Sequence, residues 1–360
     1  MDAKPKILVV DDTPGNLQYL MEILRDSYTV ATARNGVRAL ALANSSEKPE
    51  IILLDVMMHN MDGFEVCLKL KANPSTCSIP VLFITALNDE QSEVRGFTVG
   101  GVDFISKPFN SMRVKARIRT HLELKRHKDH LEELVVERTR ELEQTQDITV
   151  QTLAALAETR DPETGGHIRR TQNYVSLLAN HLHHHPRFAV LREVNMIKLL
   201  YKSSPLHDMG KVGVPDYILL KPGKLTDEEF VEMKKHAEYG WKTLTIALRQ
   251  MGNNSFLRVA AEIAYTHHEK WDGSGYPRNL AGEEIPVSGR LMALADVYDA
   301  LISRRVYKAA MSHNQATAII VEGRCQHFDP DVVDAFIALQ KQFRETAKQF
   351  ADSDTELVVD

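Results

Sequence analysis

The chain has few cysteines, no long apolar run and no excess of positive charge. Three cysteines without a Cys-x-x-Cys pair argue against a disulfide framework and a zinc knuckle, and they favour the reducing cytoplasm. No apolar stretch approaches the roughly 18 residues of a membrane span, and the N-terminus lacks a signal-peptide pattern. With 44 basic and 49 acidic residues, attraction to nucleic acid is not expected. We therefore expect a cytoplasmic protein that binds neither membrane nor nucleic acid.

The length and the histidines indicate where the chemistry lies. A chain of 360 residues exceeds the size at which single hydrophobic cores stop growing, which predicts about two domains. Eleven of the 15 histidines follow residue 150. Because histidine serves as a metal ligand and as an acid–base group, metal or acid–base chemistry is expected in the second half of the chain.

Five short apolar runs at the start of the chain predict a parallel, doubly wound α/β sheet. In such sheets the ligand site lies beyond the carboxyl ends of the strands. The expected strands are residues 6–10, 29–33, 51–54, 81–85 and 102–106. The side chains at their carboxyl ends are Asp11, Asp12, Asp55, Thr85 and Lys107.

These five side chains suit a phosphorylation site. Three aspartates at one point would repel each other unless a hard cation lies among them, and Mg²⁺ fits that requirement best. Lys107 and Thr85 would contact the phosphoryl oxygens. Asp55 would then be the nucleophile that becomes an aspartyl phosphate.

With Phe104 and the Lys107-Pro108 pair, this pattern resembles the receiver domain of two-component response regulators. The resemblance implies Mg²⁺ binding and phosphorylation of Asp55 by a partner histidine kinase or a small phosphodonor. It also implies that Thr85 and Phe104 act as the switch pair. One position departs from the family, because His59 stands where a proline usually follows the phosphoacceptor.

Residues 123–150 are charged and helical in pattern, and they predict a helical linker. Leu124, Leu131, Val135 and Leu142 lie on an interrupted heptad stripe with Glu and Arg beside it. A single solvated helix is one interpretation. A two-stranded coiled coil is the other and is preferred, because so polar a helix gains stability from a partner. A homodimer is therefore expected.

From residue 151 onward the pattern is helical, and clusters of histidine and carboxylate predict a metal centre. Nitrogen and oxygen ligands suit Fe, Mn, Zn or Ni, and so many candidates imply two or three ions. Adjacent ions can hold a bridging hydroxide and clamp both oxygens of an in-line displacement at phosphorus, which predicts phosphodiester hydrolysis. The candidates are Glu163 and His167, His207 and Asp208 with Lys211 one turn on, His236, the pair His267 and His268, and Asp296.

The order of these motifs, with Gly275-Tyr276-Pro277 after the histidine pair, strongly resembles the HD-GYP subgroup of HD phosphohydrolases. The resemblance implies hydrolysis of cyclic di-GMP to pGpG, in some members to GMP, with Fe as the first expected metal and a diguanylate cyclase as a further partner. Position by position, it implies metal binding by Glu163, His167, His207, Asp208, His236, His267, His268 and Asp296. It implies catalytic roles for Lys211 and Asp208, and substrate contacts by Asp161, Lys211, Gly275, Tyr276, Pro277, Asp299, Arg305 and Lys308.

The sequence thus predicts a multidomain response regulator with a metal-dependent cyclic di-GMP phosphodiesterase as its output. Its expected parts are an α/β receiver at residues 1–122, the linker at 123–150, an all-α HD-GYP domain at 151–345 and a tail at 346–360. Two alternatives stay open for the second domain. It could be a weakly active sensor or docking module, or a hydrolase of another phosphoester such as pGpG or a guanosine polyphosphate.

Overall fold

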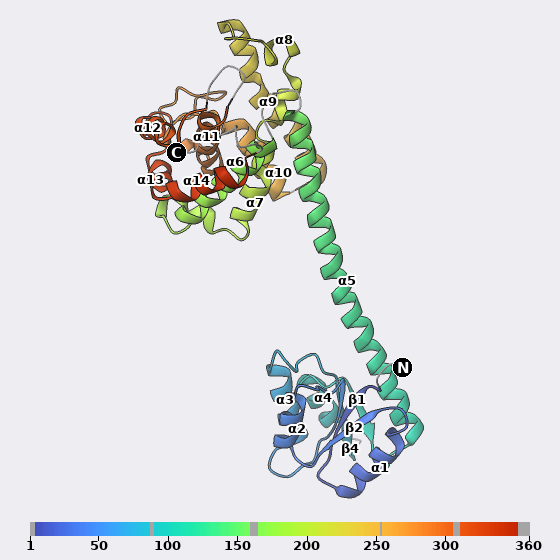
Figure 1. Ribbon diagram of the computed structural model, residues 1–360. Helices are drawn as coiled ribbons and strands as arrows, with labels where there is room; N and C mark the ends of the chain where they lie inside the picture. Colours follow the sequence, from blue (N-terminus) through green and yellow to red (C-terminus); the bar gives the residue numbers. More distant parts are fainter. Residues whose placement is uncertain (1–3, 87–89, 159–164, 253, 305–309, 352–360) are drawn as a thin grey trace. The chain divides into compact units, whose positions relative to one another are not determined.

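The computed structural model describes residues 4–86, 90–158, 165–252, 254–304 and 310–351 (Figure 1). The chain divides into two compact units, residues 1–140 and 141–360. No helix among the described residues combines the length and the apolar composition needed to cross a membrane.

The first unit contains a five-stranded parallel sheet with the strand order β2-β1-β3-β4-β5 (Figure 1). Strands β3 and β4 are buried at every position, because one apolar cluster lies on each face of the sheet. The predicted sheet is confirmed, with β3 one residue longer than expected and β5 one residue shorter. The strands are β1 Lys6–Val10, β2 Thr29–Ala33, β3 Ile51–Asp55, β4 Val81–Thr85 and β5 Asp103–Ser106.

Short helices connect these strands, and local sequence signals mark where several of them begin. Pro14 stands in the first turn of α1, where its missing N–H is not needed. The side chains of Asn35 and Asp62 cap α2 and α3 by accepting hydrogen bonds from backbone N–H groups. The four helices are α1 Pro14–Leu24, α2 Gly36–Ala43, α3 Gly63–Ala72 and α4 Glu90–Thr98.

Helix α5 runs without interruption over Ser111–Glu158. Val114 and Ile118 in its first turns are fully buried in the cluster on one face of the sheet, and Ala154 and Ala157 near its end are buried in the second unit. The sequence predicted a separate helical linker at residues 123–150. In the structure these residues form the middle of the longer helix α5. The division between the two units falls inside it, after residue 140.

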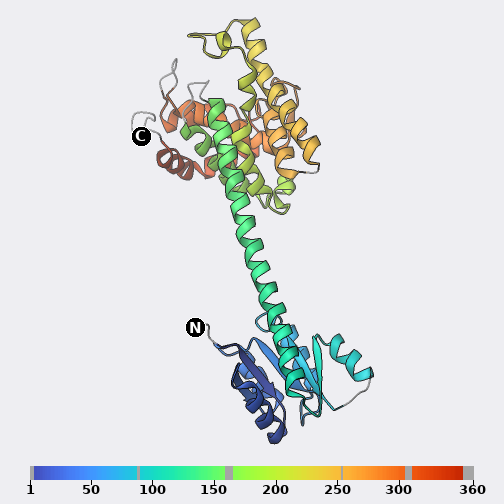
Figure 2. The ribbon, with the colours of Figure 1, turned by 90° about the vertical axis from the view of Figure 1, so that its right-hand side faces the viewer.

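The second unit is helical, and its described residues form only isolated β-bridges (Figure 2). Tyr174, Tyr298, Phe336 and Phe343 pack ring against ring at the centre of its core. Its α-helices are α6 Gly165–Leu182, α7 Met196–Ser203, α8 Asp216–Leu219, α9 Asp227–Met251, α10 Ser255–Thr266, α11 Val287–Ile302, α12 His313–Glu322, α13 Pro330–Ala338 and α14 Gln340–Gln349. Its 3-10 helices are η1 Pro186–Arg192, η2 Ser204–Leu206, η3 Met209–Gly213 and η4 Gly282–Glu284.

The C-terminal helix extends further than the sequence suggested. Helix α14 continues to Gln349, past the expected domain end at residue 345, and it buries Phe343 and Ala347 against the core. The first residues of the expected tail therefore belong to the packed domain.

Candidate metal centre

An acidic pocket lies at the carboxyl ends of β1 and β3 in the first unit. Carboxylate oxygens of Asp11, Asp12 and Asp55 lie within 4.8 Å of one another. Lys107 closes the pocket, with Nζ 3.1 Å from Asp11 Oδ2 and 2.9 Å from Asp55 Oδ1. The structure thus brings together three acids and a lysine that the sequence predicted for one site, and three oxygens in this arrangement suit Mg²⁺.

Asp55 is buried, and its surroundings disfavour its charge in the absence of a cation. Burial raises the pKa of the Asp55 carboxyl to about 6, although the hydrogen bond from Lys107 opposes the increase. A divalent cation in the pocket would favour the ionised, nucleophilic form. His59 reaches the same pocket, because its Nδ1 lies 2.7 Å from Asp12 Oδ2, and this hydrogen bond lowers the pKa of Asp12.

The expected switch residues lie on the neighbouring strands. Thr85 is the last residue of β4 and is buried. The Phe104 ring on β5 stacks against Phe83 with centroids 5.5 Å apart and meets Phe97 of α4 edge to face at 5.1 Å. Phe104 therefore connects the sheet to α4.

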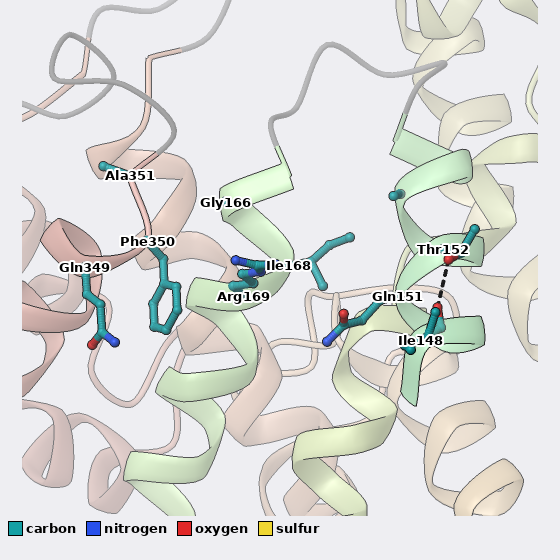
Figure 3. A pocket seen from close by; sticks show the side chains of 10 residues that line it. Ile148, Gln151, Thr152, Gly166, Ile168, Arg169, Gln349, Phe350 and Ala351 are labelled. Atoms are coloured by element: carbon teal, nitrogen blue, oxygen red, sulfur yellow. Dashed lines mark hydrogen bonds between the residues drawn. The ribbon is translucent and has the colours of Figure 1, made fainter. Parts of the chain in front are cut away.

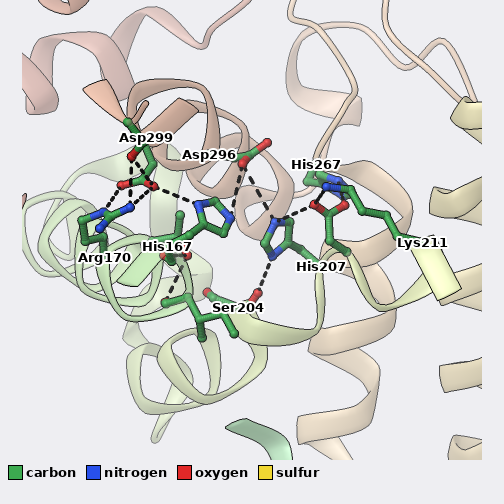
Figure 4. A network of polar contacts seen from close by, with 12 residues as sticks. His167, Arg170, Ser204, His207, Lys211, His267, Asp296 and Asp299 are labelled. Atoms are coloured by element: carbon green, nitrogen blue, oxygen red, sulfur yellow. Dashed lines mark hydrogen bonds and ion pairs between the residues drawn. The ribbon is translucent and has the colours of Figure 1, made fainter. Parts of the chain in front are cut away.

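In the second unit, seven of the predicted ligands come together in two adjacent groups. Figure 4 labels four of them, His167, His207, His267 and Asp296. They lie on or directly beside η2, α6, α9, α10 and α11, so the fold brings distant parts of the chain to one point. The His-Asp pair joins the groups, because His207 Nε2 lies 3.3 Å from Asp208 Oδ2. One group is Asp208, His236, His267 and His268, and the other is His167, His207 and Asp296.

Asp208 is the centre of the first group. Its Oδ1 lies 3.2 Å from His236 Nε2 and 3.5 Å from His267 Nε2, and its Oδ2 lies 2.8 Å from Lys211 Nζ. The close approach of this segment to α9 needs Gly210, because a Cβ there would lie 1.9 Å from the carbonyl oxygen of His236. The glycine after the His-Asp pair is therefore a packing requirement.

Backbone carbonyls orient three of the imidazoles. In each case Nδ1 faces a carbonyl oxygen, which can only accept, so Nδ1 donates and Nε2 is left to bind a cation. Among the described residues, Nε2 of His207, Nε2 of His267 and Oδ1 of Asp208 are buried and form no hydrogen bond. The contacts are His207 to Ser204 O at 2.9 Å, His236 to Met233 O at 2.8 Å and His267 to Ile263 O at 3.1 Å.

The electrostatics also prepare the first group for a cation. Burial lowers the pKa of His267, and burial with the nearby His267 and His236 lowers the pKa of His268 well below its usual value, so both present neutral lone pairs. Burial opposes ionisation of Asp208, but Lys211 and His207 together hold its pKa well below the usual range. Neutral imidazoles beside an ionised carboxylate form a donor set that fits transition-metal ions. The two groups of candidate ligands offer places for two such ions.

Comparisons with known proteins identify both domains. Residues 7–119 match the response regulator receiver domain, and residues 151–332 match the HD domain. The chain is 47% identical over 98% of its length to the "Probable cyclic di-GMP phosphodiesterase" of Vibrio cholerae, covering 81% of that protein. It is 34% identical over 97% of its length to the "Cyclic di-GMP phosphodiesterase response regulator RpfG" of Xanthomonas campestris, covering 92% of it. A "3'3'-cGAMP-specific phosphodiesterase 2" of Vibrio cholerae is 43% identical over 56% of the chain and 36% of that relative.

The chain belongs to the family of response regulators with an HD output domain. The receiver domain lies in the first unit and the HD domain in the second. The parallel α/β receiver and the largely helical hydrolase domain expected from the sequence are both confirmed.

Asp299 of the HD domain differs from its expected role. The sequence placed it at the substrate, but its side chain is 1% exposed and serves other protein groups (Figure 4). Its Oδ2 lies 2.9 Å from His167 Nδ1, and Arg170 binds both of its oxygens at 2.7 and 3.0 Å. Asp299 therefore fixes the orientation of the His167 ring, as carboxylates commonly do behind metal-binding histidines.

The Gly275-Tyr276-Pro277 loop lies against the histidine pair. The Tyr276 backbone N–H donates to His268 O at 3.2 Å, and the Tyr276 ring stacks on the His268 ring at 4.7 Å. Buried Glu269 anchors the far side of the loop, because its carboxylate accepts from Arg278 N at 2.7 Å and Leu280 N at 3.0 Å. The loop is thus held directly beside the ligands of the first group.

Sequence reasoning missed two side chains that support the centre, Arg170 and Glu269. Arg170 is fully buried and follows His167 by three residues, so helical spacing placed it on the same side of α6. Glu269 directly follows the histidine pair. Both are charged residues beside predicted ligands, which is the one signal in the sequence that could have found them.

Four predicted site residues lie outside the described residues: Asp161, Glu163, Arg305 and Lys308. Their roles stay predictions. A third metal ion, to which Glu163 would contribute a ligand, is likewise a prediction.

A separate cavity of about 550 Å³ lies beside α6, between the end of α5 and the end of α14 (Figure 3). Gly166 and Ile168, the neighbours of His167, line it together with Arg169. None of the described metal ligands lines this cavity. Another face of α5 adjoins the metal centre, because Ala154 and Ala157 line a small gap together with His207, Asp208 and Lys211.

Proposed function

We propose that the HD domain hydrolyses cyclic di-GMP to linear pGpG, with GMP as a further product. The convergence of seven candidate nitrogen and oxygen ligands, one of which, Asp208, also pairs with Lys211, carries the proposal. The names of the relatives that match almost the whole chain give independent support. The opposing enzyme class, a diguanylate cyclase, would supply the substrate.

Fe is the first candidate for the two groups of the HD domain, with Mn, Zn or Ni as alternatives and a third ion where Glu163 contributes. Bound ions would supply Lewis acidity at phosphorus and lower the pKa of a water molecule. Asp208 would hold both the ions and Lys211. The Lys211 ammonium, fixed by Asp208, would neutralise the scissile phosphate and give a proton to the leaving oxygen.

Turnover assays on the purified, metal-loaded chain test this proposal. The substrates are cyclic di-GMP, 3'3'-cGAMP and pGpG, with product chromatography and elemental analysis of the same samples. Cleavage of cyclic di-GMP with the highest kcat/KM supports the proposal. Binding of cyclic di-GMP without product would favour the sensor, and preferred cleavage of pGpG would favour the other hydrolase.

We also propose that phosphorylation of Asp55, by a histidine kinase or a small phosphodonor with Mg²⁺ in the acidic pocket, controls the HD domain. The support is the geometry of Lys107, Asp11 and Asp55 in the receiver and the course of α5. Because Ala154 and Ala157 of α5 line the gap beside Asp208 and Lys211, a small displacement of this helix would change the catalytic groups.

Asp55→Ala tests the control. An acyl phosphate donor should change the cyclic di-GMP turnover of the wild type, by about 5- to 150-fold if the coupling is typical of allosteric proteins. The turnover of Asp55→Ala should be the same with and without the donor, since the phosphoacceptor is gone. Asp26→Ala, an exposed aspartate of the same domain, is the control and should respond as the wild type does. An equal response in Asp55→Ala would reject control by phosphorylation.

A homodimer through α5 is the third part of the proposal. Leu124, Leu131 and Val135 are 66%, 60% and 63% exposed, and with neighbouring residues they line an apolar groove along the helix. Burial of each such side chain would contribute about 1.5–3 kcal/mol, which a second copy of α5 could supply.

Lys substitutions at both Leu131 and Val135 should convert the dimer to a 40.7 kDa monomer, because charge in the apolar seam opposes pairing. Light scattering coupled to size-exclusion chromatography measures the mass. The matched control replaces Glu133 and Glu137, which lie on the opposite side of the helix, by lysine. A monomeric wild type, or a dimeric Leu131→Lys/Val135→Lys variant, would contradict this seam.

A further inference from the structure

An aromatic and cationic cluster borders the metal centre beside the signature loop. Tyr276 stacks on the ligand His268 with ring centroids 4.7 Å apart, and Phe230 of α9 meets Tyr276 edge to face at 6.3 Å. Lys234 Nζ lies 5.2 Å from the centroid of the Phe230 ring and 5.7 Å from that of Tyr276. Only two ring contacts therefore separate Phe230 from a metal ligand.

The cluster is not part of the hydrophobic core. Phe230 is 47% exposed, whereas α9 packs into the domain through other residues, including Ala237 and Leu244. Lys234 follows Phe230 by four residues, so both side chains lie on one face of α9. A half-exposed aromatic ring beside a nucleotide site offers a face on which a base can stack.

The ammonium of Lys234 adds a preference for one kind of base. Lysine has hydrogen-bond donors only, and guanine presents two acceptors, O6 and N7, on one edge. Adenine places an amino donor where guanine has O6, so the same ammonium would pair with adenine less well. The rings of Phe230 and Tyr276 stabilise the positive charge of Lys234 through cation–π contacts.

We propose that Phe230 and Lys234 form a base subsite in which a guanine ring stacks on Phe230 and the Lys234 ammonium donates to O6 and N7. The inference rests on the proposed function, since the attached phosphate has to lie at the metal ligands. It assigns these two residues of α9 to substrate selection, beside the chemistry at Asp208 and Lys211.

Nucleotide inhibition of a substrate without a base tests the subsite. The assay follows hydrolysis of bis(4-nitrophenyl) phosphate by the metal-loaded full chain, with GMP or AMP added as the competitor. Phe230→Ala should raise the inhibition constants of both nucleotides by about 5- to 100-fold, as loss of base stacking does. Lys234→Ala should raise the constant for GMP by roughly 10-fold and that for AMP much less, which removes the preference. The kcat for the substrate without a base should stay unchanged in both variants.

Neighbouring residues on α9 provide matched controls. GMP and AMP should inhibit the Val231→Ala and Lys235→Ala variants as they inhibit the wild type, because Val231 is exposed and Lys235 pairs with Glu232. Phe230→Trp, which keeps an aromatic ring at this position, should be inhibited by both nucleotides, in contrast to Phe230→Ala. Unchanged inhibition in Phe230→Ala and Lys234→Ala overturns the subsite. The subsite is also overturned if both variants lose bis(4-nitrophenyl) phosphate hydrolysis as strongly as they lose nucleotide inhibition. That result would mean that Phe230 and Lys234 only support the Gly275-Tyr276-Pro277 loop. A wild type that binds GMP in this way but leaves cyclic di-GMP intact would contradict the proposed function alone.

Discussion

Asp208→Asn should lower hydrolysis of cyclic di-GMP by at least about a thousandfold and remove metal from the HD domain. The carboxylate lies within 3.5 Å of two imidazole nitrogens and 2.8 Å from Lys211, so its loss removes the anion on which both the cations and the lysine depend. Metal ions supply several kcal/mol of stabilisation to such a transition state, and each 1.36 kcal/mol is a factor of ten in rate. Elemental analysis and turnover of the same preparation measure both losses.

His184→Ala is the control for this prediction. His184 is an exposed histidine after α6 that belongs to neither ligand group, so its removal should change neither metal content nor turnover. The receiver of the Asp208→Asn variant should remain folded and accept phosphate on Asp55. Full metal content together with full activity in Asp208→Asn would rule out the proposed centre.

Gly275→Ala should lower kcat/KM by about a hundredfold while the metal content stays near that of the wild type. A Cβ at this position would lie 2.2 Å from Lys270 N and 2.5 Å from Glu269 Cα, and backbone atoms cannot move aside as a flexible side chain can. The loop would shift away from the histidine pair and take Tyr276 with it. A displacement of about 1 Å in a catalytic site can cost about a hundredfold in rate.

Gly15→Ala is the matched control, because no atom lies within 4 Å of a Cβ added there. It should leave kcat/KM unchanged. Steady-state kinetics with cyclic di-GMP and elemental analysis compare the two variants. Wild-type kinetics in Gly275→Ala would mean that the loop does not have to lie against Glu269 and Lys270.

Much of the fold could be predicted because its signals are local. Strand β3, for example, is a continuous apolar run up to Leu54, and buried parallel strands require that composition. The candidate metal ligands could be selected because their order along the chain resembles that of a known family. His207 and His236 are oriented by carbonyl oxygens only three residues away. Local sequence thus contained both the ligand and its support.

The support of His167 could not be predicted in the same way. It depends on Asp299, 132 residues further along the chain, and on Arg170, whose position near a predicted ligand does not show which carboxylate it binds. The resemblance to the HD-GYP subgroup placed Asp299 among the substrate contacts. Only the packing of α6 against α11 shows that its carboxylate faces the protein interior.

The Arg170 side chain also donates to the hydroxyl of Ser303 and to the carbonyl oxygen of Phe350, each at 3.0 Å. His167 is therefore linked through Asp299 and Arg170 to Phe350, the residue that directly follows α14, whereas His236 and His267 rely on carbonyl groups of their own helices. The part of the centre around His167 thus depends on packing of the C-terminal segment, and the part around Asp208 does not. Fraying of α14 would loosen the half that contains His167 and leave the half around Asp208 intact.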